Sequence, residues 1–212
     1  MVLRGLLFIF VLQIKYMKKI LLGALLLLST SLFSQTNLPD TLIVNPPIGL
    51  KFSMSVIEVK NYMLSKKIEI DLKYSNSNRV IYNHVKIGNI TYDFIQLSFD
   101  DNGKLFDVRC SFVPTNNATL QNYYDDVRNM IIDKYYIGKS YRNFESPYHD
   151  GDGYEMQAIS LEKGSISTYW TFKNSMISLS IDKTMSIELS YQDIKLTEIY
   201  FEKQKVKQLN DF

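Results

Sequence analysis

The amino-acid sequence predicts an α+β fold in which helices pack antiparallel β-meanders, in the order helix, strands, helix, strands, helix. Three observations carry this prediction. The stretch 120–135 repeats apolar residues with the 3.6-residue period of an amphipathic helix. Two longer regions, 68–113 and 154–192, alternate apolar and polar residues as β-strands do. The glycines from 49 onward and all five prolines fall between these elements, where turns are needed.

The N-terminal stretch has the composition of a secretory signal peptide. Two lysines follow Met17, an apolar run occupies 20–28, and a short segment rich in serine and threonine comes next. The apolar run is too short to cross a bilayer, which needs ~20 apolar residues. We therefore expect residues 1–34 to be a signal peptide that starts at Met17 and is cleaved after Ser34, or alternatively after Ser31. The protein should be exported to the periplasm or the extracellular space.

Composition limits what the remaining chain can be. Without the four basic residues of the leader, 24 basic residues become 20 against 22 acidic ones, so the net charge changes from +2 to −2. This balance does not indicate nucleic acid or an anionic membrane as a partner. The only cysteine, Cys110, rules out an internal disulfide and leaves no cysteine near the leader to carry a lipid. We expect a soluble domain with no lipid anchor and no transmembrane segment, held together by its core.

A single α+β domain is expected over 48–212, preceded by an extended arm. The arm, 35–47, contains three of the prolines, and proline holds its own backbone and that of the preceding residue in extended conformations. The two halves of the domain, 48–116 and 117–212, each begin with a helix and continue with strands. This order is compatible with two tandem helix-plus-sheet units.

The first half opens with a helix and continues as a meander. Ser55 and Glu58 have the spacing of a capping box, in which each side chain accepts a hydrogen bond from the backbone N–H of the other residue. A helix is therefore expected from Val56 to about Ser65. Asn102-Gly103 is the strongest hairpin signal in the chain. Four strands are expected, over 68–74, 79–87, 90–99 and 104–113.

The second half is organised around the amphipathic helix over 120–135. Its apolar residues span an arc of about 140° at 100° per residue, so we expect it to brace the sheet with one face and to leave Ile132 and Tyr136 outside that face. A turn-rich connection over 138–153 should follow. The remaining elements are four strands and a loosely packed helix, over 154–162, 165–172, 175–182, 185–192 and 196–209.

The start of the first helix resembles a known family. Gly49-Leu50-Lys51-Phe52-Ser53-Met54-Ser55, followed by Glu58-Val59, is similar to the helix start of exported domains of the outer-membrane assembly lipoprotein BamE type, whose fold is shared with β-lactamase inhibitor proteins. Exported bacterial proteins with a GLxFxMSxxEV opening look similar too. Ser53 stands where the family pattern has glycine. The resemblance implies a small helix-plus-sheet fold and a binding role outside the cytoplasm.

The two histidines and the single cysteine are the natural candidates for catalysis. His84 lies on an expected strand, on the face opposite Val85, and is interpreted as exposed, whereas His149 sits in no recognised motif. Cys110 alternates with apolar residues and is interpreted as a buried, inert thiol, because a reactive thiolate needs an accessible, electropositive environment. No nucleophile is paired with a base, so we expect no enzyme.

The segment 149–155 is the best candidate for a metal site. It places Asp150, Asp152 and Glu155 beside two glycines, and calcium prefers oxygen ligands clustered on a turning backbone. The spacing is not that of an EF-hand, and a solvated Asp-Gly turn is the alternative interpretation. Calcium is the one cofactor that the sequence suggests.

Tyrosine is abundant, with 15 residues, and many of them lie in the second half. Rigid amphipathic aromatic side chains are typical of surfaces that bind proteins or glycans. One of Tyr169 and Trp170 must point away from the core, because neighbours on a strand face opposite sides. The partner-binding residues that we expect are Tyr136, Tyr141, Tyr148, Tyr169 and Trp170.

Functions from different classes follow from these observations. The first is an exported, non-catalytic binding or envelope protein with a protein or glycan partner. The alternative is a calcium-dependent or hydrolytic protein centred on 150–155. A purely structural envelope protein is the third.

Overall fold

The computed structural model describes residues 42, 44–114, 116 and 119–210, and all of them belong to one compact unit, Thr41–Phe212. The signal peptide expected at 1–34 lies outside the described residues, as does most of the arm expected at 35–47. No helix within the described ranges combines the length and the apolar composition that crossing a membrane requires.

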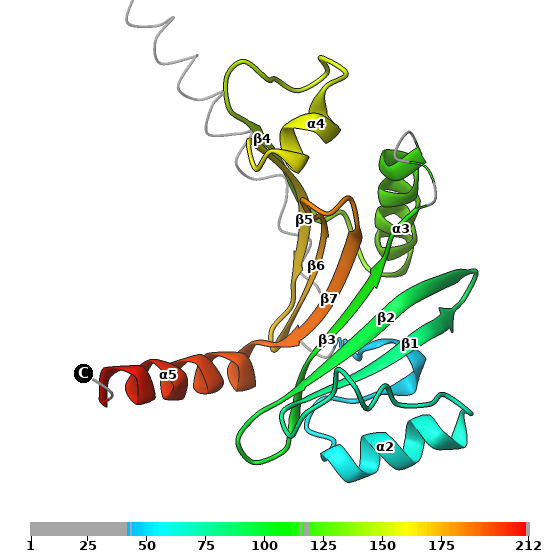
Figure 1. The fold of residues 1–212 in the computed structure, drawn as a ribbon, viewed down its shortest axis with the longest axis vertical. Coiled ribbons are helices and arrows are strands. Elements are labelled where there is room, and N and C mark those ends of the chain that lie inside the picture. Colours follow the sequence, from blue (N-terminus) through cyan, green and yellow to red (C-terminus); the bar gives the residue numbers. More distant parts are fainter. Residues whose placement is uncertain (1–41, 43, 115, 117–118, 211–212) are drawn as a thin grey trace, which may run out of the picture. The chain divides into compact units, whose positions relative to one another are not determined.

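A seven-stranded antiparallel sheet forms the centre of this unit and confirms the predicted α+β class. The spatial order of the strands is β1-β2-β3-β7-β6-β5-β4, so the two meanders meet at β3 and β7 and form one sheet (Figure 1). The strands are β1 (Arg79–Ile87), β2 (Ile90–Phe99), β3 (Leu105–Phe112), β4 (Lys139–Phe144), β5 (Gly164–Thr171), β6 (Ser175–Ile181) and β7 (Ile187–Asp193).

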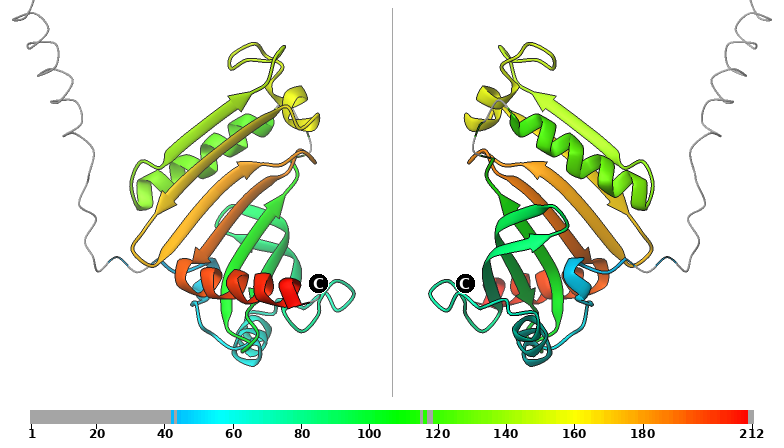
Figure 2. Two further views of the ribbon diagram at one scale, coloured as in Figure 1. Left: turned by 90° about the vertical axis from the view of Figure 1, so that its left-hand side faces the viewer. Right: turned by 90° about the vertical axis from the view of Figure 1, so that its right-hand side faces the viewer.

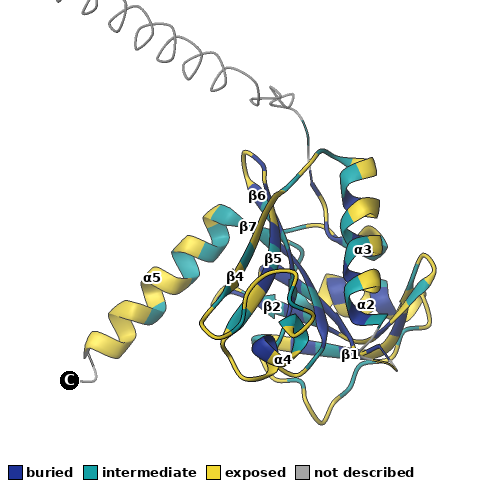
Figure 3. Cartoon of the chain, turned by 90° about the horizontal axis from the view of Figure 1, so that it is seen from above, coloured by how far each residue is buried: buried dark blue, intermediate teal, exposed yellow. Residues whose placement is uncertain are grey.

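The two longest helices lie against opposite faces of the sheet (Figure 2). Helix α3 (Leu120–Lys134) packs on β6 and β7. Helix α5 (Ile194–Asn210) crosses β3, β6 and β7 from the far side and keeps most of its residues exposed (Figure 3). Two shorter helices, α2 (Val56–Ser65) and α4 (Glu155–Ser160), and a 3₁₀ turn, η1 (Pro47–Gly49), complete the described elements.

The expected first helix is confirmed with its capping box. The backbone N–H of Ser55 donates to Glu58 Oε2 at 2.6 Å, and the N–H of Glu58 donates to Ser55 Oγ at 3.2 Å. These hydrogen bonds lower the pKa of the Glu58 carboxyl, the bond from the Ser55 backbone most of all. The same segment is tied to the β2–β3 hairpin, because the N–H of Val56 donates to Gly103 O. The cap therefore fixes both the helix and its attachment to the sheet.

Strand register sorts the side chains onto two faces. Residues paired directly across neighbouring strands point to the same side of a sheet. Two apolar rows follow from the pairing and supply much of the core. The first row runs from β4 to β1 and consists of Ser140, Thr168, Leu179, Leu189, Cys110, Ile95 and Tyr82. The second row runs from β5 to β1 and consists of Trp170, Ile177, Tyr191, Val108, Leu97 and Val80.

Helix α3 covers this apolar face as expected, with a narrower stripe than its sequence suggested. Leu120, Tyr124, Val127 and Ile131 are buried, whereas Tyr123 and Met130 are exposed. The Tyr124 hydroxyl lies 2.7 Å from Thr168 Oγ1, which is in turn 2.8 Å from Ser140 Oγ. Buried hydroxyls need partners, and this chain of three connects α3 to β5 and β4.

The strand expected over 68–74 is wrong. Only Ile70 bridges to Tyr82 of β1, and Leu72 is 78% exposed. Asp71 explains the difference, because its Oδ1 accepts hydrogen bonds from the backbone N–H groups of Lys73 and Tyr74 and so turns the chain away from β1. The alternating pattern of residues 68–74 is that of a strand. A side chain that accepts hydrogen bonds from the neighbouring backbone, however, competes with the hydrogen-bond ladder of a sheet.

The element assignment over 138–162 is also corrected. The expected connection contains β4, whose side chains are mostly exposed because it is an edge strand, so no apolar alternation marks it. The strand expected over 154–162 is α4 instead. Its buried residues are Ala158 and Ile159, with Glu155 partly covered, and this spacing follows a helix rather than a strand.

We predict that Gly138→Ala destabilises the protein by about 1–2 kcal/mol. A Cβ at this position would lie 2.6 Å from Trp170 Cε2 and 2.8 Å from Thr168 Cγ2, so the indole would have to shift. Overpacking of this kind costs about 1–3 kcal/mol, and the reduced freedom of the unfolded chain offsets less than 1 kcal/mol of it.

Urea unfolding followed by the emission of Trp170, the only tryptophan, measures this effect. The neighbouring Ile137→Ala is the control, because Ile137 is largely exposed and its truncation should change stability by no more than about 0.5 kcal/mol. Equal midpoints for Gly138→Ala and the wild type would contradict the prediction.

Candidate functional site

The face of the sheet opposite α3 carries three polar rows and is crossed by α5 at one end (Figure 2, left). We call it the open face. Serine, threonine, asparagine and glutamine dominate the rows, which contain three basic and two acidic residues. The rows are Tyr141, Ser167, Ser180, Glu188, Ser111, Phe94 and Asn83; Lys139, Tyr169, Ser178, Ser190, Arg109, Gln96 and Ile81; and Thr171, Met176, Gln192, Asp107, Ser98 and Arg79.

An aromatic pair marks the β4–β5 end of the open face. The rings of Tyr141 and Tyr169 meet edge to face with centroids 5.8 Å apart, and both residues are 37% exposed. The Lys139 ammonium lies 5.1 Å from the centre of the Tyr141 ring. Of the Tyr169-Trp170 pair, it is therefore tyrosine that points away from the core, as alternation requires.

A charged cluster lies in the middle of the open face, on β3 and β7. Asp107 is buried and accepts hydrogen bonds from Ser190 Oγ at 2.8 Å and Ser98 Oγ at 3.3 Å. Arg109 Nε lies 3.3 Å from Glu188 Oε1, close enough for an ion pair, but the atoms are not aligned for a hydrogen bond. Burial raises the pKa of the Glu188 carboxyl, against the opposing effect of Arg109. The Arg109 Nε is buried and has no hydrogen-bond partner among the described residues.

A hollow of about 350 Å³ lies where α5 crosses the open face, and we call it the α5 hollow. Aromatic rings form one wall, with Tyr200 of α5 stacked on Phe106 at 4.8 Å. Amide, hydroxyl, carboxylate and guanidinium groups form the rest. The lining residues are Asn76, Asn78, Arg79, Gln96, Ser98, Phe99, Phe106, Asp107, Arg109, Gln192, Tyr200 and Phe201.

Two of the five expected binding residues have roles inside the fold. Trp170 is fully buried, and its Nε1–H donates to Tyr136 O at 2.8 Å. The Tyr136 hydroxyl donates to Thr171 O at 2.8 Å, so this tyrosine is fastened to β5. Tyr148 lies in the connection after β4, apart from the open face. Tyr141 and Tyr169 are the two that the structure brings together.

The acidic segment expected to hold calcium uses its carboxylates within the loop. Asp150 and Glu155 lie 2.6 Å and 3.8 Å from Arg142 nitrogens, and Glu155 also accepts from the N–H of Gly151. Asp152 accepts from the N–H groups of His149 and Tyr154. No group of three acidic, histidine or cysteine side chains suited to a metal ion occurs among the described residues.

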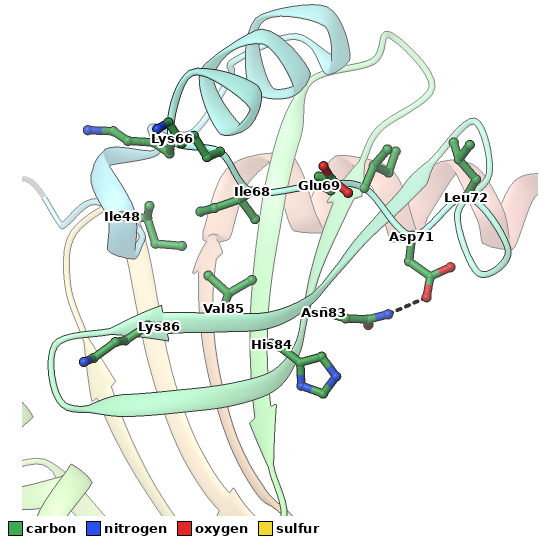
Figure 4. A pocket seen from close by; sticks show the side chains of 12 residues that line it. Ile48, Lys66, Ile68, Glu69, Asp71, Leu72, Asn83, His84, Val85 and Lys86 are labelled. Atoms are coloured by element: carbon green, nitrogen blue, oxygen red, sulfur yellow. Dashed lines mark hydrogen bonds between the residues drawn. The ribbon is translucent and has the colours of Figure 1, made fainter.

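The candidates for catalysis are not assembled into a site. His84 is exposed on β1 and is one of the residues that line a hollow at the sheet edge, where its ring points away from Val85 and Ile68 (Figure 4). His149 is exposed, with Nδ1 3.3 Å from Asp152 Oδ2. Cys110 is fully buried, and burial raises the pKa of its thiol well above the ordinary range.

In comparisons with protein-family models, curated proteins and solved structures, nothing matches this chain.

Sequence reasoning missed the central part of this face. Asp107 and Arg109 fall on the polar side of the strand expected over 104–113, and their alternation with apolar residues puts them on one face. Glu188 and Ser190 join them through the pairing of β3 with β7, which no local pattern indicates. The contribution of Tyr200 depends on how α5 crosses the sheet.

We predict that calcium at millimolar concentration leaves the melting temperature unchanged. A ligand stabilises a protein when it binds the folded state, and the loop carboxylates already have partners in Arg142 and the backbone. Thermal melting with and without calcium measures this. A saturable rise that Asp150→Ala abolishes would show that the carboxylates gather on the ion.

Asp152 should make the loop sensitive to acid. Hydrogen bonds from two backbone N–H groups lower the pKa of its carboxyl, and the bond from His149 has a larger effect than the bond from Tyr154. A carboxyl whose pKa is lower in the folded state than in the unfolded state stabilises the folded protein at any pH above its unfolded-state pKa, near 4. This stabilisation is lost as the pH falls through the folded-state pKa. The wild type should therefore melt above Asp152→Asn at neutral pH, and the difference should shrink between about pH 5 and about pH 2.

Melting temperatures of both proteins over this range test the prediction. Asp133→Asn is the control, because Asp133 is exposed on α3, away from the N–H groups that bind Asp152. A difference that is constant with pH would contradict the role of the Asp152 carboxylate.

Proposed function

We propose that this chain is an exported, non-catalytic binding module whose open face binds a neutral saccharide. The observation that carries the proposal is the α5 hollow, where aromatic rings face amide, hydroxyl, carboxylate and guanidinium groups across about 350 Å³. A saccharide presents hydroxyls that donate and accept hydrogen bonds, and its C–H faces pack on aromatic rings. The hollow supplies a partner for each of these features.

The composition of the open face favours a saccharide over a protein partner. Protein interfaces are enriched in aromatic residues, methionine and arginine at their cores and are depleted in serine. Six of the residues in the three rows are serines, whereas Phe94, Ile81 and Met176 are the only non-tyrosine apolar ones. Hydroxyls and amides without a strong net charge suit a neutral, hydroxyl-rich ligand.

The arrangement of the face also suggests how a longer saccharide would lie. The middle row runs across the sheet from Gln96 and Arg109, which line the hollow, past the buried Ser190 to the half-buried Ser178 and on to Tyr169. Neighbouring strands are about 4.8 Å apart, so this path is about 20 Å long. An oligosaccharide bound in the hollow would extend over Ser178 to the Tyr141–Tyr169 pair.

Export and the absence of catalysis are parts of the same proposal. The lysines after Met17, followed by the apolar run at 20–28, support a secretory leader. The likeness of 49–59 to exported BamE-type domains supports a binding role. His84, His149 and Cys110 lie apart and form no pair of nucleophile and base, which supports binding rather than turnover.

The proposal is tested by binding to a broad glycan array, followed by calorimetry with the oligosaccharide that binds. Gln96→Ala and Tyr169→Ala should each weaken binding by about tenfold, which corresponds to about 1.4 kcal/mol. Tyr154→Ala is the matched control, because Tyr154 is an exposed tyrosine outside the open face and its loss should leave affinity unchanged.

Two outcomes would overturn the proposal. One is the absence of saturable binding to any glycan of the array by a folded wild-type protein. The other is equal affinity of the wild type and Gln96→Ala for the glycan that binds. A protein partner bound through the same residues in place of a glycan would likewise replace the saccharide proposal.

A further inference from the structure

A second cavity lies on the opposite side of the sheet, between α3, the β1–β2 hairpin and the segment that contains η1. Its volume is about 300 Å³, which is near the lower limit for pockets that bind small organic molecules. We call it the α3 cavity. The lining residues are Asn45, Pro47, Ile48, Ile87, Ile90, Tyr92, Val127, Met130, Ile131, Lys134, Tyr135, Leu189 and Tyr191.

The wall formed by η1 is fixed in place rather than loosely apposed. The Tyr62 hydroxyl of α2 donates to Ile48 O at 2.9 Å, and Ile48 has a positive φ of 67°. The next residue, Gly49, packs against the same tyrosine, and a Cβ at this position would lie 2.4 Å from the Tyr62 hydroxyl. A β-branched residue rarely adopts such a φ, so surrounding contacts hold this turn against the cavity.

Two tyrosines bring polar groups into these apolar surroundings. Tyr92 is 3% exposed and Tyr191 is 8% exposed, and both line the cavity. A tyrosine hydroxyl can donate a hydrogen bond as well as accept one. Burial raises the pKa of both groups, which therefore remain protonated and able to donate.

A cation lies at the rim of the same cavity. Lys134, in the last turn of α3, lines it with an exposed side chain and holds its ammonium 5.0 Å from the centre of the Tyr135 ring. Apolar walls, two tyrosine hydroxyls and one ammonium are a combination that a ligand with an apolar body and an anionic oxygen group would satisfy.

We propose that the α3 cavity binds a small molecule with an apolar body and a single carboxylate, such as a medium-chain fatty acid. The apolar body replaces water against Ile48, Val127 and Leu189, and the carboxylate accepts from the tyrosine hydroxyls and attracts Lys134. The proposal is independent of saccharide binding, because the two cavities share no lining residue.

Titration calorimetry and thermal melting with octanoate test this inference. Octanoate should bind the wild type with saturation and raise its melting temperature. Tyr191→Phe removes one hydroxyl donor and keeps the side-chain volume nearly constant. It should weaken octanoate binding by about tenfold, because a hydrogen bond to a charged group contributes more to affinity than one between neutral groups. Octanol has the same apolar body without the carboxylate and should bind at least about tenfold more weakly.

Tyr74→Phe is the control variant, because Tyr74 is exposed and lies outside the α3 cavity. The Tyr74→Phe variant should bind octanoate with the same affinity as the wild type. Val127→Phe narrows the cavity and should abolish binding, and the emission of Trp170 verifies that each variant is folded. Absence of octanoate binding by the wild type, or equal affinity of Tyr191→Phe and the wild type, would overturn the proposal.

Discussion

The pairing of β3 with β7 determines what each face of the sheet can be. It joins residues far apart in the chain, such as Asp107 with Gln192, and the hydrogen bond from Ser190 Oγ to Asp107 Oδ1 lies across the same joint. The register aligns Cys110 with Leu189 on one side and Arg109 with Ser190 on the other. A slip of one residue would place apolar side chains opposite polar ones along the whole joint, so burial of one face specifies this register strongly.

The joint also relates the two halves to each other. Each half is a helix followed by a meander, and in each the last strand is the inner one. In the second half the outermost strand, β4, pairs along its six residues, whereas in the first half the corresponding segment makes a single bridge at Ile70. The turn at Asp71 accounts for this difference, and it leaves the second part of β1 as a sheet edge.

What the sequence could predict follows from the range of the interactions involved. The capping box of α2, the hairpin at Asn102-Gly103 and the apolar stripe of α3 are local patterns, and each was located correctly. The strand β4 and helix α4 were missed because an edge strand needs no apolar face and because a six-residue helix shows too few turns to establish a period.

The candidate sites show the same division between local and distant information. Alternation required that one of Tyr169 and Trp170 point away from the core, and the structure shows that this residue is Tyr169. The α5 hollow, by contrast, combines β2 and β3 with a helix from the end of the chain, and the α3 cavity combines η1 with α3 and β7. Neither can be seen in one segment, because each depends on which strands pair and which face a helix covers.

The strand β7 contributes to both cavities, and its alternation keeps them apart. Tyr191 faces the α3 cavity, while its neighbours Ser190 and Gln192 lie in the polar rows of the open face. A ligand on one side therefore touches side chains that the other ligand cannot reach. Interior strands paired on both sides resist displacement, since a shift would break two ladders and move residues such as Leu189 out of the core. The pairing that sorts the two faces is thus also what allows one thin sheet to present two chemically different surfaces.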